Sequence, residues 1–486
     1  MSLINKVFVS SLFLISVKVV ERSIGLISLL ILARLLTPDD FSIIALTSIT
    51  IYFFDVLASA GSEQYIIQKD NVTNDDLNTA WTIDLLLKSS LAILLILFSP
   101  TIATFFSKPG LQYTLSVSSF LLLINAAKNP ALFMLKQNLD YKNIFKITIA
   151  AKVTSFVFVI SIAYTQQTYW ALVIGDIIAS IVILFGSYLI HNYKPSLSLK
   201  MKNQQWHFSK WMFIKSIVGY IRSQIDTVWV SKIFSSGLSG QYYMVRNIAM
   251  LPCQNILSPA IEPLIAAFRI NRKNSDVLKD KINFSLFIIT LITIPMVVFI
   301  NQNATLIVSV LLGEQWLNSG ETLANLSLLL LYFPYALLFE QIMIVKNKLR
   351  AAFVFDLLSL TTIISIFYLA SLANIETVAL YRGLIGICVT LVLAFYIKFI
   401  TRFSGIFSFV SIIFIGLIAV ISSFITATLN NNTEMNPIVS LILNIFIYSA
   451  MYLVITMIFN WMLHKKSKLL QSINNQIVHA IIKQKQ

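Results

Sequence analysis

Charged residues are scarce in this sequence. Only 12% of the 486 residues are Asp, Glu, Lys or Arg, and 57% are hydrophobic, whereas soluble globular proteins carry about 25% charged residues. The apolar residues come in blocks of about 20, which is the length that a helix needs to cross the hydrocarbon core of a bilayer. The composition excludes an ordinary soluble protein and predicts an integral membrane protein.

Cysteine and histidine are also rare. The two cysteines, Cys253 and Cys388, lie in apolar blocks and offer neither a disulfide framework nor a metal-ligand spacing. The four histidines fall in predicted loops or in the C-terminal tail. We therefore expect no metal site and no bound cofactor. The sequence contains no GxxxxGK[ST] phosphate-binding loop, and no predicted loop exceeds roughly 25 residues. These absences predict that the chain is not an enzyme and does not hydrolyse ATP.

Hydropathy predicts an all-α polytopic membrane protein with about fourteen transmembrane helices. The predicted segments are Phe8–Ala33, Phe41–Ile66, Trp81–Phe98, Tyr113–Lys128, Ile147–Tyr164, Trp170–Ile190, Trp211–Phe234, Gly240–Leu264, Ile282–Ile300, Leu323–Val345, Ala352–Leu372, Val378–Ile400, Ile406–Leu429 and Ile438–Met462. We divide the chain into a first lobe (residues 1–192), a second lobe (193–403), two extra C-terminal helices (404–463) and a cytoplasmic amphipathic tail (464–486).

Loop charges predict the orientation of these helices. With a cytoplasmic N-terminus, 25 of the 36 basic residues fall in the cytoplasmic loops and termini, and only Arg34, Lys108 and Lys232 fall in the loops on the other side. This asymmetry predicts that both termini are cytoplasmic. The same dispersal over many short loops argues against nucleic-acid binding as the reason for the net charge of +15.

Two loops at an offset of 198 residues indicate that the six-helix lobes are repeats. Residues 33–43 end the first segment and begin the second, and residues 231–241 do the same for the seventh and eighth. The offset places Ser42 opposite Gly240. Because six segments separate the copies, both have the same orientation, which predicts parallel repeats with a cavity at their interface.

Charged side chains occur inside two equivalent predicted helices. Lys18, Glu21 and Arg22 form one helical stripe, and Lys215, Arg222 and Asp226 form another. A charge at mid-bilayer costs roughly 2.5–3.5 kcal/mol on insertion scales, so such groups face protein or water. They predict either a cationic cavity for an anionic head group, since Arg and Lys suit phosphate, or structural ion pairs within each stripe.

Further intramembrane charges extend this prediction. Lys88 and Arg246 lie deep in their segments and are candidate cavity cations. Asp84 precedes Lys88 by one helical turn and either tunes its charge or neutralises it. Glu21, Asp84 and Asp226 are candidates for charge tuning or ion coupling. Three further carboxylates are isolated in the sequence and either bind a proton or sodium ion or are satisfied polar groups: Asp55, Asp176 and Asp356.

The chain resembles the Wzx-type polysaccharide repeat-unit flippases of the multidrug/oligosaccharidyl-lipid/polysaccharide exporter superfamily. Residues 33–41 (ARLLTPDDF) resemble the first loop of that family, and residues 311–316 (LLGEQW) resemble its loop between segments nine and ten. Arg222 to Asp226 falls where family members carry an Arg/Asn-rich turn before an Asp. The sequence departs from the family pattern at Gln224, where Asn is usual, and at Ser42, where Gly is common.

The resemblance implies a V-shaped two-lobe carrier in the bacterial inner membrane. Its implied cargo is an undecaprenyl-diphosphate-linked oligosaccharide for O-antigen, capsule or exopolysaccharide, moved by alternating access with proton or sodium coupling in some members. Implied partners are the lipid bilayer, a polysaccharide polymerase and a chain-length regulator. The alternatives are a flippase for lipid II or another lipid-linked sugar, a multidrug cation exporter of the same superfamily, and an O-antigen polymerase or ligase. The basic stripes argue against the exporter, and the lack of a large extracytoplasmic loop argues against the enzymes.

Overall fold

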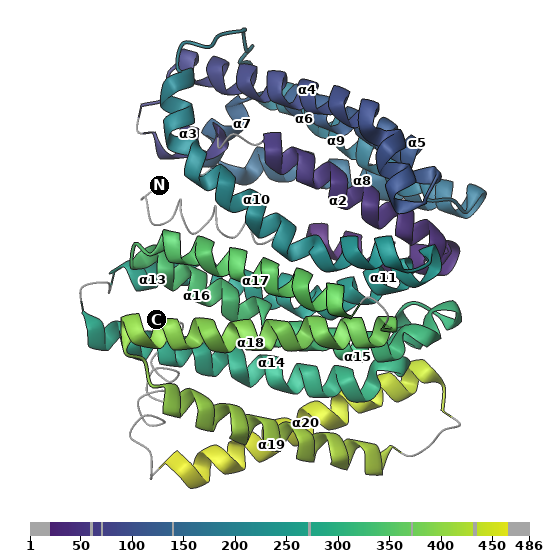
Figure 1. Ribbon diagram of the computed structural model, residues 1–486, viewed down its shortest axis with the longest axis vertical. Helices are drawn as coiled ribbons and strands as arrows, with labels where there is room; N and C mark the ends of the chain where they lie inside the picture. Colours follow the sequence, from purple (N-terminus) through teal and green to yellow (C-terminus); the bar gives the residue numbers. More distant parts are fainter. Residues whose placement is uncertain are drawn as a thin grey trace. The chain divides into compact units, whose positions relative to one another are not determined.

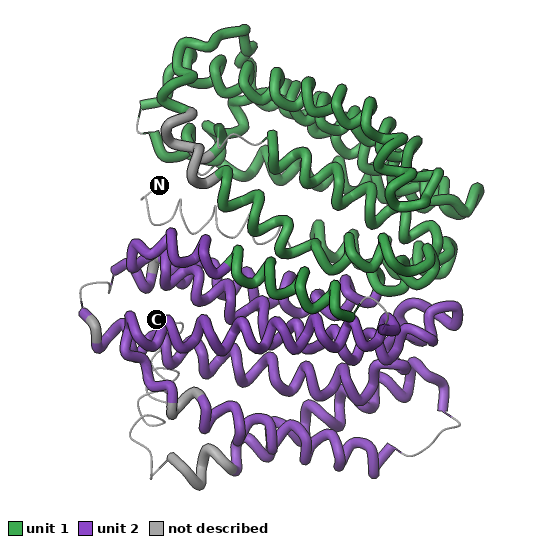
Figure 2. Tube along the Cα trace, in the orientation of Figure 1, with its two compact units in different colours: residues 1–244, 356–371 green, residues 245–355, 372–486 purple. Residues whose placement is uncertain are grey.

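The computed structural model describes residues 20–58, 62–69, 71–138, 140–270, 274–370, 373–430 and 435–464. Within these ranges every regular element is a helix (Figure 1). The chain divides into two compact units (Figure 2). Unit 1 comprises residues 1–244 and 356–371, and unit 2 comprises residues 245–355 and 372–486. The all-helical fold class is therefore confirmed.

Unit 1 contains a helix over residues 20–35 and the helices that directly follow it in sequence. They are α2 (Pro38–Ala58), α3 (Ser62–Gln68), α4 (Asn74–Phe106), α5 (Gly110–Ser118), α6 (Phe120–Ala126), α7 (Ala131–Gln137), α8 (Tyr141–Gln166), α9 (Trp170–Ile190) and α10 (Lys202–Ile233). Unit 1 also takes the beginning of α11 (Ser236–Pro252) and most of α17 (Leu349–Leu369).

Unit 2 takes the rest of α11 and α17 and the remaining helices. They are the π-helix η1 (Cys253–Leu257), α12 (Ser258–Ile261), α13 (Leu264–Ile270), α14 (Ser275–Leu311), η2 (Glu314–Ser319), α15 (Gly320–Leu326), η3 (Ser327–Leu331), α16 (Phe333–Val345), α18 (Ile375–Thr401), α19 (Gly405–Leu429) and α20 (Pro437–His464). Their main core joins α14, α16 and α18 through side chains that include Leu286, Phe339 and Ile397.

Ten helices in the described ranges are long and apolar enough to cross a membrane, or eleven if the bent pair 110–126 and 131–137 forms one span. They match eleven of the fourteen predicted segments. The other three are the first, seventh and eighth segments, which contain intramembrane charges or several prolines and, in the first, residues outside the described ranges. The protein is thus a multi-pass membrane protein. The count of fourteen and the lobe boundaries stay predictions, and the predicted tail at 464–486 lies almost wholly outside the described residues.

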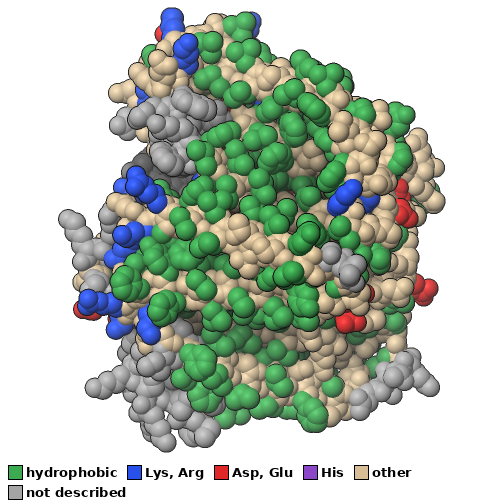
Figure 3. Space-filling model, viewed as in Figure 1, with side chains coloured by type: hydrophobic (Ala, Val, Ile, Leu, Met, Phe, Trp, Pro, Cys, Tyr) green, Lys and Arg blue, Asp and Glu red, His purple; other side chains and the backbone are tan. Residues whose placement is uncertain are grey.

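Hydrophobic side chains cover the middle of the visible face of the helices (Figure 3). Independently of that view, Leu86, Ile93 and Leu97 on α4 are 54%, 59% and 66% exposed. Their spacing of seven and then four residues places them on one face of the helix. In a soluble protein such a row would be an association surface, whereas in a membrane it faces lipid.

The eighth predicted segment is a series of short helices. Helix α11 ends at Pro252, the π-helix η1 follows, and α12 and α13 continue the chain. Proline removes a backbone donor and disturbs the turn before it, and π-turns commonly mark such irregular points. Pro252, Pro259 and Pro263 all lie in this segment and are consistent with that arrangement.

The two loops that share the 198-residue offset lie together in unit 1. A Cβ atom added to Gly240 would lie 1.7 Å from the carbonyl oxygen of Pro38, so only glycine permits this contact between the beginnings of α2 and α11. The buried Lys108 ammonium donates hydrogen bonds to Ser42 Oγ at 2.5 Å and to Ser239 Oγ at 3.3 Å. Burial lowers the pKa of Lys108 from its ordinary 10.5 to about 8, and nearby Asp39 opposes this effect.

Candidate functional site: a polar cavity in unit 1

A cavity of about 330 Å³ lies among the helices of unit 1. Helices α2 and α9 each line it with six residues, in which steps of three alternate with adjacent pairs as on one face of a helix: Ile44, Thr47, Ser48, Ile51, Tyr52 and Asp55, and Leu172, Val173, Asp176, Ala179, Ser180 and Ile183. This spacing keeps each set on one face of its helix. The rest of the wall comes from Glu21, from α5, α6 and α8.

The charges on the cavity wall are mainly acidic. Glu21, Asp55 and Asp176 contribute three carboxylates, and Lys152 contributes one ammonium group. Two of these carboxylates, Asp55 and Asp176, are isolated in the sequence, so the fold assembles an acidic cluster that spacing along the chain does not reveal. The wall is suited to hold protons, a small cation or hydroxyl groups.

The ion pair between Lys88 and Asp55 joins α4 to α2 beside this cavity. The Lys88 Nζ atom lies 3.1 Å from Asp55 Oδ1, and the two side chains are 11% and 35% exposed. That oxygen is buried and accepts no hydrogen bond of good geometry, so the contact is mainly electrostatic. Asp84, the predicted neighbour of Lys88, accepts a hydrogen bond from Ser62 Oγ at 3.1 Å.

Hydrogen bonds between helices hold the polar wall in place. Thr47 on α2 and Thr114 on α5 share a hydrogen bond of 2.8 Å between their hydroxyl groups. Ser155 on α8 donates to the carbonyl oxygen of Gly175 on α9 at 2.8 Å. A Cβ atom on Gly175 would lie 2.1 Å from Val159, so glycine is required for the close packing of these two helices. Asn125 also lines the cavity, and its buried side-chain oxygen has no hydrogen-bond partner.

The predicted cation stripes are only partly described. Lys18 lies outside the described residues. Arg22 is half-buried on the helix over residues 20–35, next to Glu21 in sequence, but only Glu21 is among the residues that line the unit 1 cavity. Lys215 is half-buried on α10, and Arg246 on α11 is only 7% exposed. The substrate-binding role of these residues stays a prediction.

Arg222 pairs with a carboxylate that sequence spacing does not suggest. Its Nε atom lies 3.4 Å from Asp356 Oδ1 of α17, and both side chains are 15% exposed. Asp226, the neighbour expected to balance Arg222, is fully buried and accepts a hydrogen bond from the Tyr242 hydroxyl group at 3.2 Å. The Arg222–Asp356 pair connects α10 to the part of α17 that belongs to unit 1.

Further polar contacts of unit 1 fix the beginning of α4. Thr73 and Asp76 form a reciprocal capping box there, a motif that stabilises helix N-termini. Lys69 Nζ lies 2.6 Å from Asp76 Oδ1, and this hydrogen bond raises the pKa of Lys69. Among the residues that the structure describes, no group of three or more His, Cys, Asp and Glu side chains is placed to hold a metal ion.

Together, the apolar helices and the polar cavity define a polytopic, all-helical membrane protein. The chain matches the family described as "Polysaccharide biosynthesis protein" over residues 31–321. Because this match covers more than half of the chain, the protein belongs to that family.

Three curated relatives are similar in sequence. The chain is 23% identical over 358 residues to an uncharacterized membrane protein of the Klebsiella pneumoniae cps region, covering 72% of this chain and 73% of that protein. It is 22% identical over 304 residues to the lipopolysaccharide biosynthesis protein WzxC of Escherichia coli K12. It is 22% identical over 300 residues to the succinoglycan biosynthesis transport protein ExoT of Rhizobium meliloti 1021. The last two matches each span 61% of both chains, less than two thirds of either relative.

Solved structures show the same fold. The lipid II flippase MurJ, in an inward closed conformation, matches with a TM-score of 0.75 at 18% identity, over 94% of this chain and 99% of MurJ. An inward-facing multidrug resistance transporter of the MATE family matches with a TM-score of 0.60 at 11% identity, over 79% of this chain and 98% of that one. At these identities the matches show that the chain shares their fold.

Proposed function

We propose that this protein moves undecaprenyl-diphosphate-linked oligosaccharide repeat units from the inner to the outer leaflet of the bacterial cytoplasmic membrane. The observation that carries this proposal is family membership over residues 31–321, supported by relatives named for lipopolysaccharide biosynthesis and for succinoglycan transport. A fold shared with a lipid II flippase over 94% of the chain agrees with it. The protein would act as a carrier and not as an enzyme.

The physical task of such a carrier is to keep a polar head group out of hydrocarbon. Sugars and a diphosphate would lose their hydrogen bonds to water in the bilayer core, while the polyprenyl tail can remain in lipid. Cations that bind the diphosphate weakly would let it be released on the other side. The candidate cations are Lys18, Arg22, Lys88, Lys215, Arg222 and Arg246, of which Lys88 and Arg222 have the carboxylate partners described above.

We assign energy coupling to the unit 1 cavity. Its three carboxylates and the unpaired oxygen of Asn125 supply acceptors for protons or a sodium ion. Glu21, which the sequence suggests as a coupling residue, lies on this wall with Asp55 and Asp176. Protonation of one carboxylate would change its attraction to Lys152 or Lys88, and thereby the packing of α2 against its neighbours. Alternating access driven by such a change completes the proposed mechanism.

Deletion and replacement of the gene in its bacterial host would test the transport role. Loss of the protein should cause undecaprenyl-linked repeat units to accumulate in extracted lipids and should reduce surface polymer. Arg22→Gln should reproduce this phenotype with normal protein abundance, whereas Arg350→Gln, a change at an exposed position in the first turn of α17, should not. Normal surface polymer and no accumulated lipid in the deletion strain would refute the proposed function.

The acidic cavity also supports a second candidate function. Cationic drugs require buried carboxylates, and the wall with Glu21, Asp55 and Asp176 supplies them. A cation exporter would extrude ethidium from energised cells, and Asp176→Asn would abolish the extrusion. Ethidium retention equal to that of cells without the protein would reject this candidate and leave the lipid-linked sugar carrier.

A further inference from the structure

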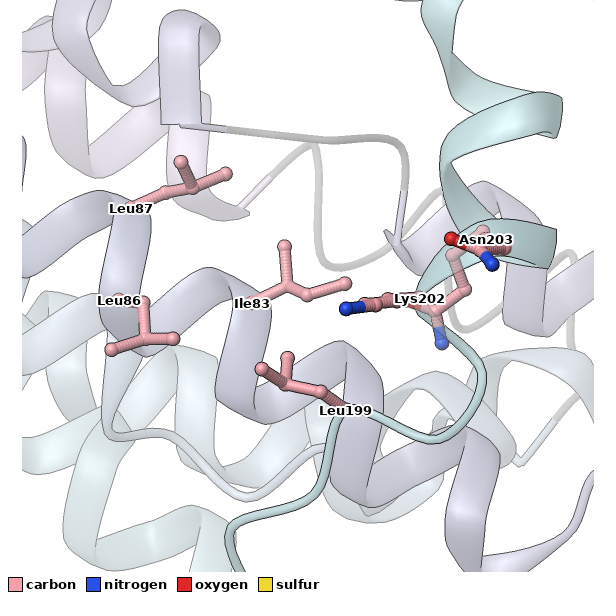
Figure 4. Close-up of a pocket in the computed structure, with 7 residues that line it drawn as sticks. Ile83, Leu86, Leu87, Leu199, Lys202 and Asn203 are labelled. Carbon is pink, nitrogen blue, oxygen red and sulfur yellow. The ribbon is translucent and has the colours of Figure 1, made fainter.

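A second cavity, of about 370 Å³, lies on the surface of unit 1 where α4 meets the beginning of α10 (Figure 4). Ile83, Leu86 and Leu87 of α4 form one side of it, and Leu199 lies in the segment that leads into α10. Leu86 and Leu199 are 54% and 41% exposed. The apolar wall therefore opens on the surface that continues along α4 through Ile93 and Leu97, the row that faces lipid.

The other side of this cavity is polar and positive. Lys202, Asn203 and Gln205 line it. Lys202 is the first residue of α10, and the preceding residue, Met201, provides no side-chain cap. The first amides of a helix carry partial positive charge and bind anions. The Lys202 ammonium group and this helix terminus together favour a phosphate.

The side-chain oxygen of Gln205 favours a ligand that carries a hydrogen-bond donor. Its side chain is only 2% exposed, and its Nε2 atom donates to the carbonyl oxygen of Asp76 at 3.0 Å. Its Oε1 atom is buried and has no hydrogen-bond partner among the residues that the structure describes. A buried acceptor without a partner is costly, so a ligand that donates a hydrogen bond would stabilise this residue.

We propose that this cavity binds an anionic glycerophospholipid, phosphatidylglycerol, of the leaflet that the loop charges predict to be cytoplasmic. One acyl chain would lie against Ile83, Leu86, Leu87 and Leu199, the phosphodiester would contact Lys202 and the α10 terminus, and a head-group hydroxyl would donate to Gln205. The Lys202 ammonium group and the α10 terminus both carry positive charge, which favours an anionic head over one that carries an ammonium group. This inference does not rest on the proposed transport function.

Native mass spectrometry of the full-length protein, titrated with phosphatidylglycerol or phosphatidylcholine of identical acyl chains, tests this site. Wild-type protein should bind phosphatidylglycerol more tightly, because phosphatidylcholine is zwitterionic and its head group has no donor for Gln205. Lys202→Gln should raise the dissociation constant for phosphatidylglycerol about fivefold, the effect of one Lys near a membrane surface. The matched change Lys194→Gln, at an exposed position outside the cavity, should leave it within about twofold.

A second variant examines the head-group contact. Gln205→Met removes the acceptor and keeps an unbranched side chain, so it should reduce the preference for phosphatidylglycerol over phosphatidylcholine. Equal affinity of the wild-type protein for both lipids would overturn the proposal, and so would equal weakening by Lys202→Gln and Lys194→Gln. Tighter binding of undecaprenyl phosphate than of phosphatidylglycerol, lost in Lys202→Gln, would also overturn it, because the cavity would then serve a polyprenyl lipid.

Discussion

Replacement of Asp55 should destabilise unit 1 more than replacement of its partner Lys88, because the two side chains are unequally buried. Lys88 is 11% exposed and Asp55 is 35% exposed, at a separation of 3.1 Å between charged atoms. Loss of one member of a buried pair costs roughly 3–5 kcal/mol, and loss of an exposed pair costs about 0–1 kcal/mol. Asp55→Asn leaves the nearly buried Lys88 ammonium group without its partner and should cost about 3 kcal/mol. This value is at the low end of the range because the Asp84 carboxylate, one helical turn from Lys88, still attracts the ammonium group. Lys88→Met leaves a carboxylate on a polar cavity and should cost about 1 kcal/mol.

The double variant separates this pair from other effects of the two substitutions. Asp55→Asn with Lys88→Met removes both charges, and we expect a total cost of about 2 kcal/mol, so the coupling energy between the sites is about 2 kcal/mol. The free energy of unfolding can be measured by titrating purified protein in mild detergent micelles with sodium dodecyl sulfate, with helicity as the signal. Costs that simply add in the double variant would refute the argument, because they would show that the two charges do not interact.

Three further predictions concern packing, pH and a second ion pair. Gly175→Ala should lower the free energy of unfolding by roughly 1–3 kcal/mol through overpacking. Gly219→Ala should not lower it, because a Cβ atom at Gly219 meets no atom within 4 Å. Equal costs of the two variants would contradict the close packing of α8 against α9. Lys108 has its pKa lowered to about 8, so between pH 8 and 10.5 the unfolded chain holds a proton that the native chain has released. The free energy of unfolding should therefore rise with pH in this window, and Lys108→Met should reduce that rise; an unchanged slope would show that Lys108 does not titrate there. Arg222→Gln should destabilise the protein more than Arg222→Gln with Asp356→Asn, and the opposite order would exclude a stabilising pair.

Hydropathy and charge were sufficient to predict the helical class, because both follow from local composition. Blocks of about 20 apolar residues must satisfy their backbone hydrogen bonds internally in a membrane, which only helices and closed barrels achieve. Hydropathy does not predict the shape of the eighth segment. The run of suitable hydropathy that contains Pro252 forms a π-helix and short α-helices. A hydropathy scale cannot show this, because it does not record that proline lacks a backbone hydrogen-bond donor.

Ion pairs could not be predicted from spacing alone. Spacing of three or four residues on one helix suggests Asp84 for Lys88 and Asp226 for Arg222, yet in the structure Lys88 pairs with Asp55 and Arg222 with Asp356, both on other helices. The partner of a buried charge depends on which helices pack together, and one sequence without relatives does not contain that information. The acidic cavity was missed for the same reason. The α2 stripe from Ile44 to Asp55 was the available signal, since polar Thr47, Ser48 and Asp55 share one face of an apolar helix.

Transport of a lipid-linked oligosaccharide across a bilayer is the central claim, and a reconstituted assay tests it most directly. Undecaprenyl diphosphate oligosaccharide is incorporated into both leaflets of vesicles, and a glycosidase added outside cleaves only the oligosaccharides on the outer face. With the purified protein in the membrane and a proton or sodium gradient across it, nearly all of the oligosaccharide should become cleavable. Cleavage that stops at about half of the oligosaccharide, as in vesicles without protein, would contradict the account.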